Sequence, residues 1–420
     1  MRVDILAIGS LGDVQPYVAL GLGLQRVGHR VRIVTLGGFE EFVANFGLDH
    51  FSIGGSTRDI VAAALGRDYG TQRTRDVSFF NALLRVVDPL IEANIANYWP
   101  ACRDVQALVM SSPLGHFAGG AYIAERLRIP LVRAEVHPRH DWQARRILVA
   151  ALRGEWTPFL VTVIRLLMWR KLRGSTNAAR RKILGLPPLA LTEPFGSMDR
   201  KQVPLLLAYS PAVVPRPRHW GDWVHVTGYW FLDDPPGWSP PGELLDFLRS
   251  GPRPVFVGFG SNPFPNPDAA TERVVRALRR ADRRGLLVAG GSGLATGRLA
   301  DEVLSVDFVP HSWLFPRVCA AVHHGGAGVT GTALRAGLPS VVIPVSVDQP
   351  FWAQRVFRLG AGPRPIPAKQ LTESALASAI RATASKEMRH RAAALGEQIR
   401  LEDGVARAVE AFHEHIRVVQ

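Results

Sequence analysis

The segment richest in chemical possibilities is His323-His324-Gly325-Gly326-Ala327-Gly328, which follows the apolar run Ala320–Val322. Its three glycines let the backbone approach an anion closely, and Val329–Ala336 is predicted to continue as a helix. The first turn of a helix presents unpaired N–H groups and a partial positive charge, which suit a diphosphate. His323 can donate a hydrogen bond to a phosphate oxygen. The alternative is a tight strand-to-helix turn with a structurally satisfied histidine.

Polar side chains also follow two other predicted strands. Asp348 and Gln349 come after Ser340–Pro344, and their carboxylate and amide offer acceptors and donors for sugar hydroxyls. The alternative for this pair is an Asx-type turn before a helix. Ser261 ends the predicted strand Pro254–Phe259 and could contact a second phosphate.

Short apolar runs alternate with helical patterns in both halves of the chain, which predicts two α/β domains with parallel sheets. In such sheets ligands bind beyond the carboxyl ends of the strands, where these motifs fall. The expected strands are Val3–Gly9, Arg30–Thr35, Ala107–Ser111, Leu131–Ala134, Trp223–Trp230, Pro254–Phe259, Gly285–Ala289, Ser305–Val309, Ala320–His323 and Ser340–Pro344. The expected helices are Pro16–Gly28, Gly119–Arg128, Asp268–Arg280 and Val329–Ala336.

A proline-rich zone separates the two halves and sets the predicted boundaries. We expect a first α/β domain at 1–215, a linker at 216–222 and a second α/β domain at 223–403. The last segment, 404–420, is expected to form a helix that packs back on the N-terminal domain.

Composition argues against several classes of protein. With 420 residues, 47% of them hydrophobic, and a mean hydropathy of +0.06, the chain can bury two substantial cores. Cys102 and Cys319 are too few for a disulfide framework or a four-thiolate zinc site. No signal peptide and no charge-free run long enough to span a membrane is visible. We expect a cytoplasmic protein, with the inner membrane surface as an alternative location.

The formal net charge of +14 does not indicate nucleic-acid binding. Only five of the 50 basic residues are lysines, and residues 141–182 alone hold ten basic and two acidic residues. No zinc-finger spacing, ribonucleoprotein signature or basic heptad accompanies this segment. A membrane-facing patch or a binding flap fits it better.

The usual nucleotide-binding signatures are absent. Gly9, Gly12, Gly21 and Gly23 do not give G-x-G-x-x-G, and no G-x-x-x-x-G-K-[ST] occurs. Dehydrogenase and nucleoside-triphosphatase activities are therefore disfavoured.

Several motifs together resemble family 1 nucleotide-sugar glycosyltransferases of the GT-B architecture, in which two Rossmann-like domains face each other across a cleft. The branch most similar is that of sterol glucosyltransferases and bacterial antibiotic and macrolide glycosyltransferases. The similarity is dense in the C-terminal half and rests mainly on the first loop in the N-terminal half. The matching segments are GSLGD at 9–13, VTGYW at 226–230, VFVGFGS at 255–261, FVPHSWLFPR at 308–317, HHGGAG at 323–328 and LRAGLPSVVIPVSVDQPFWAQRV at 334–356.

The resemblance implies that the domain at 1–215 is an acceptor-binding domain and that the domain at 223–403 is a nucleotide-sugar-binding domain. It also implies a role for each matched residue. His323 and the backbone amides around it would contact the diphosphate, Ser10 and Ser261 would flank the phosphates, and Asp348 with Gln349 would hold the sugar. Phe308 and Val309 would frame the base, with Trp313 close by. The donor-site residues implied are Ser10, Ser261, Phe308, Val309, Trp313, His323, Gly325, Gly326, Ala327, Gly328, Asp348 and Gln349.

Asp13 takes the place of the catalytic base in this resemblance. Plant-type members use a histidine in the first loop, but here no histidine precedes His29, so Asp13 acts alone or with a later histidine. Asp13 also precedes a predicted helix and could be its N-cap, and the two roles are compatible.

The donor is expected to be UDP-glucose, with a dTDP-sugar as the alternative. Plant-type members carry a ribose-binding glutamate eight residues after the diphosphate histidine, and here that residue is Gly331. No D-x-D pair exists, and Asp233-Asp234 is adjacent rather than spaced, so we expect inverting transfer without a metal and without a further cofactor.

The acceptor signal is the apolar segment Trp156–Trp169, which Arg165 interrupts. It is either a buried helix, a flap over a lipophilic acceptor or a membrane-surface helix. Trp156, Trp169 and His137 are the candidate acceptor-binding residues, and His219 is a weaker one. The expected reaction is hexose transfer to a sterol, macrolide or other natural product. The alternatives are a membrane glycolipid-forming enzyme that docks through 141–182 and a catalytically silent auxiliary homologue.

Overall fold

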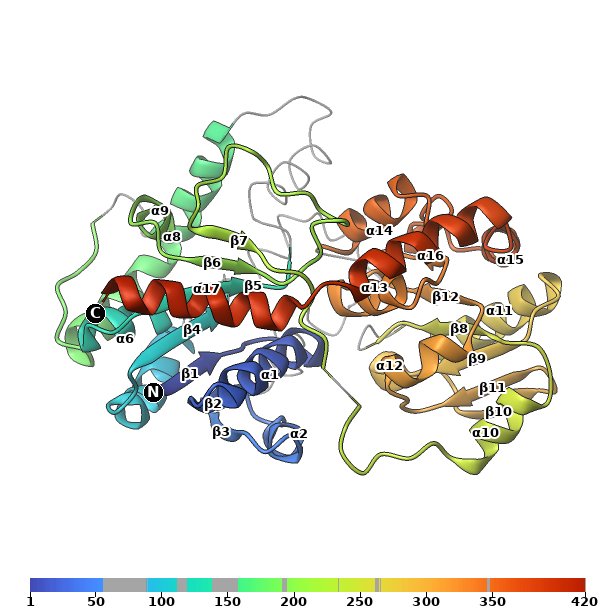
Figure 1. Ribbon diagram of the computed structural model, residues 1–420, viewed down its shortest axis with the longest axis horizontal. Helices are drawn as coiled ribbons and strands as arrows, with labels where there is room; N and C mark the ends of the chain where they lie inside the picture. Colours follow the sequence, from blue (N-terminus) through green and yellow to red (C-terminus); the bar gives the residue numbers. More distant parts are fainter. Residues whose placement is uncertain are drawn as a thin grey trace. The chain divides into compact units, whose positions relative to one another are not determined.

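The computed structural model describes residues 1–55, 88, 90–111, 119–137, 158–190, 195–232, 234–260, 264, 266–345 and 348–419. The chain divides into two compact units (Figure 1). The first unit contains Met1–Ala208, Arg216–Trp230 and Gly404–Gln420, and the second contains Tyr209–Pro215 and Phe231–Asp403.

The described residues of the first unit form a seven-stranded parallel sheet in the order β3-β2-β1-β4-β5-β6-β7. Its central strands are rich in Val, Ile and Leu and are buried on both faces, as expected of a parallel sheet covered by helices. The strands are β1 (Arg2–Leu6), β2 (Arg30–Thr35), β3 (Asp49–Ser52), β4 (Ala107–Ser111), β5 (Leu131–Glu135), β6 (Leu205–Leu207) and β7 (Val224–Val226).

Helices cover this sheet, and one hydrophobic cluster joins β1, β2 and β4 to α6 and α8 through residues such as Leu6, Ile123 and Leu172. The helices of the first unit are α1 (Leu11–Arg26), α2 (Glu40–Asn45), α6 (Gly120–Leu127), α8 (Pro158–Lys182), α9 (Phe195–Arg200) and α17 (Gly404–Val419), with a 3₁₀ turn at Trp99–Cys102.

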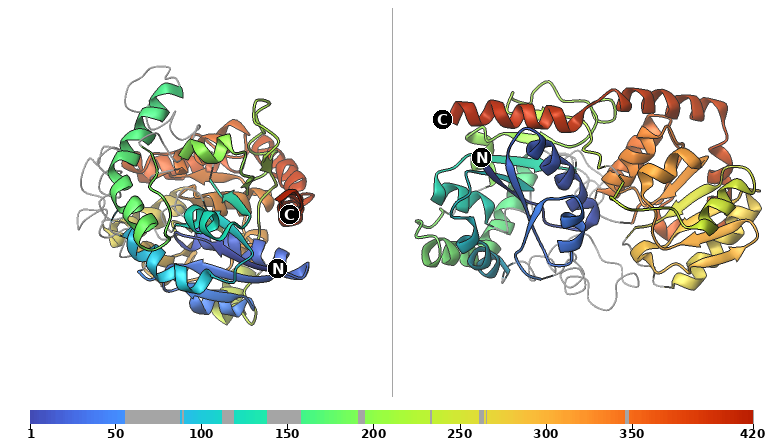
Figure 2. Two further views of the ribbon diagram at one scale, coloured as in Figure 1. Left: turned by 90° about the vertical axis from the view of Figure 1, so that its left-hand side faces the viewer. Right: turned by 60° about the horizontal axis from the view of Figure 1, so that its bottom comes forward.

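The C-terminal helix α17 runs beside α1 within the first unit (Figures 1 and 2). The approach is close, because a Cβ atom on Gly23 would collide with Val405. Nε2 of His29 also lies 2.8 Å from Nε2 of His413. The last segment of the chain therefore completes the unit that begins at its first residue.

The described residues of the second unit form a six-stranded sheet in the order β10-β11-β9-β8-β12-β13, parallel except for the β10–β11 pair. The strands are β8 (Val255–Gly258), β9 (Gly285–Val288), β10 (Gly297–Ala300), β11 (Val303–Val306), β12 (Ala320–His323) and β13 (Ser340–Val342). The helices are α10 (Gly242–Arg249), α11 (Pro267–Arg280), α12 (His311–Leu314), α13 (Ala327–Arg335), α14 (Gln349–Arg358), α15 (Glu373–Ala382) and α16 (Lys386–Arg400), with 3₁₀ turns at Gly290–Ser292, Phe315–Arg317 and Ala368–Gln370.

Each face of this sheet has its own hydrophobic cluster. Val274 and Leu278 of α11 pack with Leu376 of α15 on one face. Phe247 of α10 and Ala333 of α13 pack on the other. The sheet is thus the middle layer of three, which is the doubly wound arrangement expected from the βα alternation.

The structure corrects two predicted boundaries. Helix α1 begins at Leu11 rather than Pro16, because Ser10 is the N-cap and Asp13 completes a capping box with it from the third helical position. Asp13 is therefore not the N-cap. The segment 224–226, placed in the second domain from sequence, forms β7 of the first sheet because it pairs with β6.

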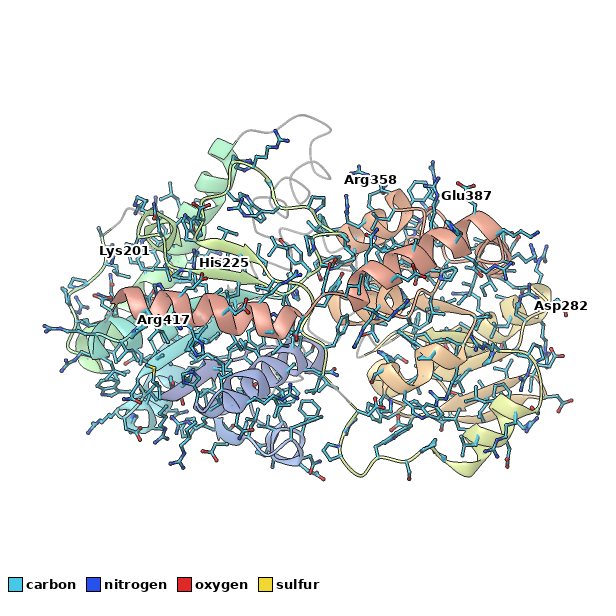
Figure 3. All side chains as sticks on the ribbon, in the orientation of Figure 1. Lys201, His225, Asp282, Arg358, Glu387 and Arg417 are labelled. Carbon is cyan, nitrogen blue, oxygen red and sulfur yellow. The ribbon has the colours of Figure 1, made fainter. Side chains whose placement is uncertain are left out.

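Charged side chains lie on the surface of both units. Exposed examples are Lys201 and Arg417 in the first unit and Asp282, Arg358 and Glu387 in the second (Figure 3). Within the residues that the structure describes, no helix combines the length and the apolar character needed to cross a membrane.

Candidate active site

Three neighbouring parallel strands of the second unit, β8, β12 and β13, end at the same edge of the sheet. His323 is the last residue of β12, and the glycine-rich loop after it leads into α13, whose N-cap is Gly326. The next strand, β13, leads to Asp348 and Gln349 at the start of α14. Sheet order therefore brings the two motifs found in the sequence to one place.

His323 is held in one tautomer by its own loop. The backbone N–H of Gly325 donates to Nδ1 of His323 at 3.1 Å, so the proton of the neutral ring is on Nε2. Nε2 is buried and has no hydrogen-bond partner among the described residues. Leaving a buried donor unsatisfied costs about 1–3 kcal/mol, a cost that an incoming acceptor atom would remove. The geometry suits a phosphate oxygen at this atom.

The histidines around this loop are uncharged at neutral pH. Burial, together with the neighbouring His324 and His311, lowers the pKa of His323 to about 3. Burial also lowers the pKa of His324 and of His311 to about 4 each. An anion here would be held by N–H dipoles of the loop, of His323 and of the first turn of α13, rather than by histidine charge.

Glycine is required at two positions of the loop. Gly325 has φ +89°, and a Cβ atom there would lie 2.7 Å from Cγ1 of Val342 and 3.2 Å from the carbonyl oxygen of Gln349. A Cβ atom on Gly326 would lie 2.6 Å from Nε2 of His324. The loop therefore packs directly on the start of α14 and on a histidine that the sequence prediction did not use.

Asp348 and Gln349 are buried and fixed in orientation. Nε1 of Trp352 donates to Oδ2 of Asp348 at 2.8 Å, and the backbone N–H of Val345 donates to Oε1 of Gln349 at 2.8 Å. Asp348 occupies the N-cap position of α14, but its side chain makes no capping hydrogen bond to the helix. Trp352 thus positions the carboxylate, a role that was not predicted although it lies in the same motif.

The three residues expected near the nucleotide base have different surroundings. Phe308 is 51% exposed, whereas the side chain of Val309 is buried in the core of the unit. Trp313 packs edge-on against Trp238 at 5.3 Å between centroids and carries the Arg317 guanidinium 4.1 Å above its ring. Phe308 and Trp313 can present aromatic surface to a ligand, while Val309 can contribute only backbone groups.

In the first unit, the sheet brings Asp13 and His137 together although 123 residues separate them in the sequence. Asp13 follows β1 and His137 follows β5. Nε2 of His137 lies 3.2 Å from Oδ1 of Asp13. Oδ2 of Asp13 accepts hydrogen bonds from the backbone N–H of Ser10 at 2.7 Å and from its hydroxyl at 2.9 Å. Ser10 therefore contacts the proposed base directly.

Not all of the remaining predicted site residues are described. The donor-site residue Ser261 and the acceptor-site residue Trp156 lie outside the described residues, as does the part of the basic segment that precedes α8, 141–157. Trp169 is 1% exposed, and its indole N–H donates to the carbonyl oxygen of Ala190 at 3.0 Å. This placement favours the buried-helix alternative for that end of the segment. His219 is exposed.

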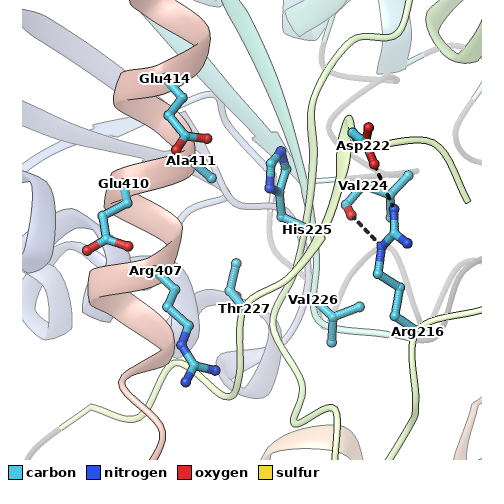
Figure 4. A pocket seen from close by; sticks show the side chains of 10 residues that line it. All are labelled: Arg216, Asp222, Val224, His225, Val226, Thr227, Arg407, Glu410, Ala411 and Glu414. Carbon is cyan, nitrogen blue, oxygen red and sulfur yellow. Dashed lines mark hydrogen bonds and ion pairs between the residues drawn. The ribbon is translucent and has the colours of Figure 1, made fainter.

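A pocket of about 400 Å³ lies elsewhere in the first unit, between β7 and α17 (Figure 4). It is lined by two arginines, three carboxylates and His225, and Arg216 is held by the carbonyl oxygen of Val224 at 3.2 Å. This mixture of charges has no excess of cations for a diphosphate, and none of the predicted site residues lines it. Within the described residues, no group of three or more His, Cys, Asp or Glu side chains is placed to hold a metal ion.

Comparison with protein families gives two matches that together cover most of both units. Residues 3–144 match the model of the glycosyltransferase family 28 N-terminal domain. Residues 274–406 match the model of the erythromycin biosynthesis protein CIII-like C-terminal domain.

Individual relatives match nearly the whole chain. A sterol 3-beta-glucosyltransferase of Arabidopsis thaliana is 34% identical over 99% of this chain and 68% of its own length. A sterol 3-beta-glucosyltransferase of Cryptococcus neoformans is 34% identical over 99% of this chain. The chain spans only about a quarter (27%) of that fungal relative.

Solved structures share the fold at low sequence identity. The glycosyltransferase of kitacinnamycin superposes with a TM-score of 0.70 at 18% identity, over 99% of both chains. The glycosyltransferase VinC in complex with dTDP has a TM-score of 0.65 at 20% identity, over 100% of this chain and 99% of that one.

Proposed function

The chain belongs to the glycosyltransferase family that includes the sterol 3-beta-glucosyltransferases, and on that premise we propose that it transfers a hexose from a nucleoside diphosphate sugar to a hydroxyl of a lipophilic acceptor. The acceptor class is a sterol, a macrolide or another natural product. The observation that carries the proposal is the buried Nε2 donor of His323, which ends β12 just before the glycine loop and lacks a partner among the described residues.

In the proposed reaction, the acceptor oxygen attacks the anomeric carbon of the sugar from the face opposite the diphosphate. The bond between that carbon and the diphosphate oxygen breaks, and the diphosphate leaves with the electron pair. Nε2–H of His323 and the N–H groups of the first turn of α13 stabilise the negative charge on the leaving group. The configuration at the anomeric carbon is inverted, and no metal ion takes part.

The second unit also supplies the groups that would orient the sugar. Asp348 and Gln349 are the proposed partners of its hydroxyls, because Trp352 and Val345 fix their side chains beside the glycine loop. Phe308 and Trp313 are the proposed surface for the base, and Ser261 a further phosphate contact. UDP-glucose is the proposed donor and a dTDP-sugar the alternative, since Gly331 offers no side chain to recognise a ribose hydroxyl.

In the first unit, Asp13 belongs to the group that takes the proton from the acceptor hydroxyl. Its carboxylate accepts a hydrogen bond from the backbone N–H of Ser10, and Oδ1 lies 3.2 Å from Nε2 of His137. The acceptor itself is proposed to be lipophilic because of the apolar segment 156–169, most of which lies outside the described side chains.

The test is a matrix of UDP- and dTDP-sugars against sterols, macrolides and polyphenols, read by mass spectrometry of the glycoside formed. We expect a hexosyl product with at least one lipophilic hydroxyl, unaffected by EDTA. The anomeric configuration, determined by NMR, should be opposite to that of the donor. If no donor is turned over and neither UDP nor dTDP raises the melting temperature, the proposed function is wrong. Loss of activity on chelation, restored by Mg²⁺ or Mn²⁺, would contradict the metal-free mechanism.

A further inference from the structure

Helix α17 is held against the first unit by an apolar stripe and by a contact between two histidines. Ala408, Phe412 and Ile416, spaced four residues apart, are buried along the helix. Nε2 of His413 lies 2.8 Å from Nε2 of His29, which is in the turn between α1 and β2. The rings of Phe412 and His29 also pack edge to face, with 5.6 Å between their centroids. His29 is therefore part of the surface on which α17 docks.

The positions of the hydrogens in this contact follow from the surroundings of His29. A hydrogen bond between two Nε2 atoms needs one donor and one acceptor. Nδ1 of His29 is buried and has no hydrogen-bond partner among the described residues. With both rings neutral, Nε2 of His29 is therefore assigned as the donor and Nε2 of His413 as the acceptor, because the unpartnered Nδ1 then carries no hydrogen.

An additional proton has no favourable place in this arrangement. If it binds to His29, Nδ1 carries a hydrogen that no described group accepts. If it binds to Nε2 of His413, that atom becomes a donor, and the hydrogen of His29 must move from Nε2 to Nδ1. In both cases a buried N–H is left without an acceptor, which costs free energy. Protonation of either ring therefore destabilises the docked state of α17.

The charges around His29 also oppose its protonation. Burial, the amino group of Met1 and the ring of His413 together lower the pKa of His29. The next residue, Arg30 of β2, pairs with Asp49 at 3.5 Å. The hydrogen-bond geometry of the contact and the charges near it therefore act in the same direction.

A second pair of histidines lies between α17 and the first sheet. His225 of β7 and His415 of α17 are both half-buried. Burial lowers the pKa of both rings, and His225 lowers that of His415 in addition. Glu414 and Asp222 raise the pKa of His225, whereas Arg216 lowers it. Figure 4 shows His225 facing α17 across the pocket, with Glu414 on the helix. These carboxylates make the second pair less sensitive to acid than the first.

We propose that the docking of α17 on α1 depends on pH, and that uptake of a proton by the His29–His413 contact releases the helix. His225 and His415 add a smaller effect of the same sign. None of these four residues belongs to the candidate active site, so the proposal goes beyond the proposed function and is independent of it.

The direction of the pH effect follows from where protons bind. A histidine freed from the docked state takes up its proton near pH 6.5, whereas the docked contact resists it. The released state therefore binds more protons below that pH, and its population relative to the docked state rises by up to about 10-fold per pH unit for each proton gained. The chain enters α17 from the second unit at Asp403, so a released helix stays attached to the protein through that unit.

Hydrogen–deuterium exchange of the α17 amides, measured by mass spectrometry on the full chain, tests the proposal. Each rate is corrected for the intrinsic pH dependence of amide exchange. Between pH 6.5 and 5.5 we expect the protection of α17 to fall about 10- to 100-fold, corresponding to one or two protons gained on release. The amides of α16 in the second unit are followed in the same samples and report any change that is not specific to α17.

The decisive variant is His29→Gln, because its amide fits both protonation states of His413. The amide N–H can donate to the neutral ring, and after rotation the amide oxygen can accept from the protonated ring. The pH dependence of α17 protection should therefore largely disappear. His413→Gln should keep an intermediate pH dependence, because Nδ1 of His29 stays buried and unpartnered. The matched control is His390→Gln on the exposed surface of α16, which should keep the wild-type pH dependence at α17.

Three results would overturn the proposal. The first is protection of wild-type α17 that does not change with pH, or that falls only in parallel with α16, since either would show that docking itself is insensitive to protons. The second is a His29→Gln variant with the pH dependence of the wild type. The third is a larger pH dependence in His29→Gln than in His413→Gln, which would contradict the role of Nδ1 of His29. Circular dichroism at pH 7.5 shows whether each variant is folded, and if His29→Gln is not, the comparison of α17 with α16 in the wild type decides.

Discussion

The polar side chains at the carboxyl edges of the two sheets differ in their exposure to solvent. His323 is fully buried and neutral, with its tautomer fixed by Gly325, whereas Asp13 and His137 are each a quarter to a third exposed. A dry site with fixed dipoles costs little reorganisation when it meets a charged leaving group. A partly wet pair can exchange a proton with solvent after each turnover. Under the proposed function, the second unit stabilises the charge of the leaving group and the first unit takes the proton of the acceptor hydroxyl.

The largest expected effect comes from removing the carboxylate of the partly exposed Asp13–His137 pair. Asp13→Asn keeps the shape of the side chain but removes the carboxylate that is proposed to take the proton of the acceptor hydroxyl. We expect kcat to fall about 10²–10⁴-fold while donor affinity stays within a factor of about two. Initial rates by chromatography and UDP binding by calorimetry measure the two quantities. A rate near wild type would reduce Asp13 to the partner of Ser10 in the capping box.

Substitution of the buried His323 should change the affinity for the nucleotide rather than the transfer of a proton. His323→Ala removes a hydrogen bond to a charged phosphate, worth about 1.5–3 kcal/mol, or roughly 10- to 150-fold in nucleotide affinity. His323→Gln places an amide N–H near the position of Nε2 and should recover part of this loss. Calorimetric titration with UDP and with dTDP tests both variants. Unchanged affinity for both nucleotides in His323→Ala would remove the histidine from the donor site.

The rigidity of the dry site can be tested with two glycines of the same loop. Gly325→Ala forces a side chain onto a residue with φ +89° against Val342 and should destabilise the protein by about 1–3 kcal/mol. Gly328→Ala is the matched control, because no atom lies within 4 Å of the added Cβ and the residue is helical. Alanine there should stabilise by about 0.5–1 kcal/mol. Melting temperatures that shift in the same direction would contradict the packing described for the loop.

The last expected effect is on the pH dependence of stability. Folding lowers the pKa values of His311, His323 and His324 to between about 3 and 4, whereas an unfolded histidine takes up its proton near pH 6.5. Below about pH 6.5 the unfolded state therefore binds more protons, and the free energy of unfolding should fall as the pH drops towards 4. Urea denaturation between pH 5 and 7 measures the slope. His311→Phe, which keeps an aromatic ring against Phe315, should make it shallower, and exposed His390→Gln should not.

The same contrast decides what could be read from the sequence. The glycine loop after His323 is contiguous, so residue types and spacing alone indicated a strand, an anion-binding turn and a helix. The Asp13–His137 pair could not be read in this way, because it depends on β1, β4 and β5 lying side by side. His137 was predicted only as an acceptor residue, and a later histidine as partner of Asp13 was left without a number.

Predictions from local sequence were also wrong or incomplete where the pairing of strands in the folded sheet decided the structure. The segment 224–226 follows a proline-rich stretch that favours a domain boundary, yet it adds to the first sheet through β6. The strand β10 was not predicted, because Gly297–Ala300 is short and partly polar and pairs antiparallel at the edge of its sheet. Trp169 lies in a segment rich in basic residues, and the sequence left open whether its side chain is buried. The hydrogen bond from its indole N–H to the carbonyl oxygen of Ala190 now favours burial.

The position of α17 has a consequence for how the protein is made. Translation delivers α1 before the second unit, but α17, which packs against Gly23 of α1 and places His413 beside His29, is synthesised after that unit. The face of α1 that α17 covers therefore stays exposed, or is bound by a chaperone, while the whole second unit is synthesised.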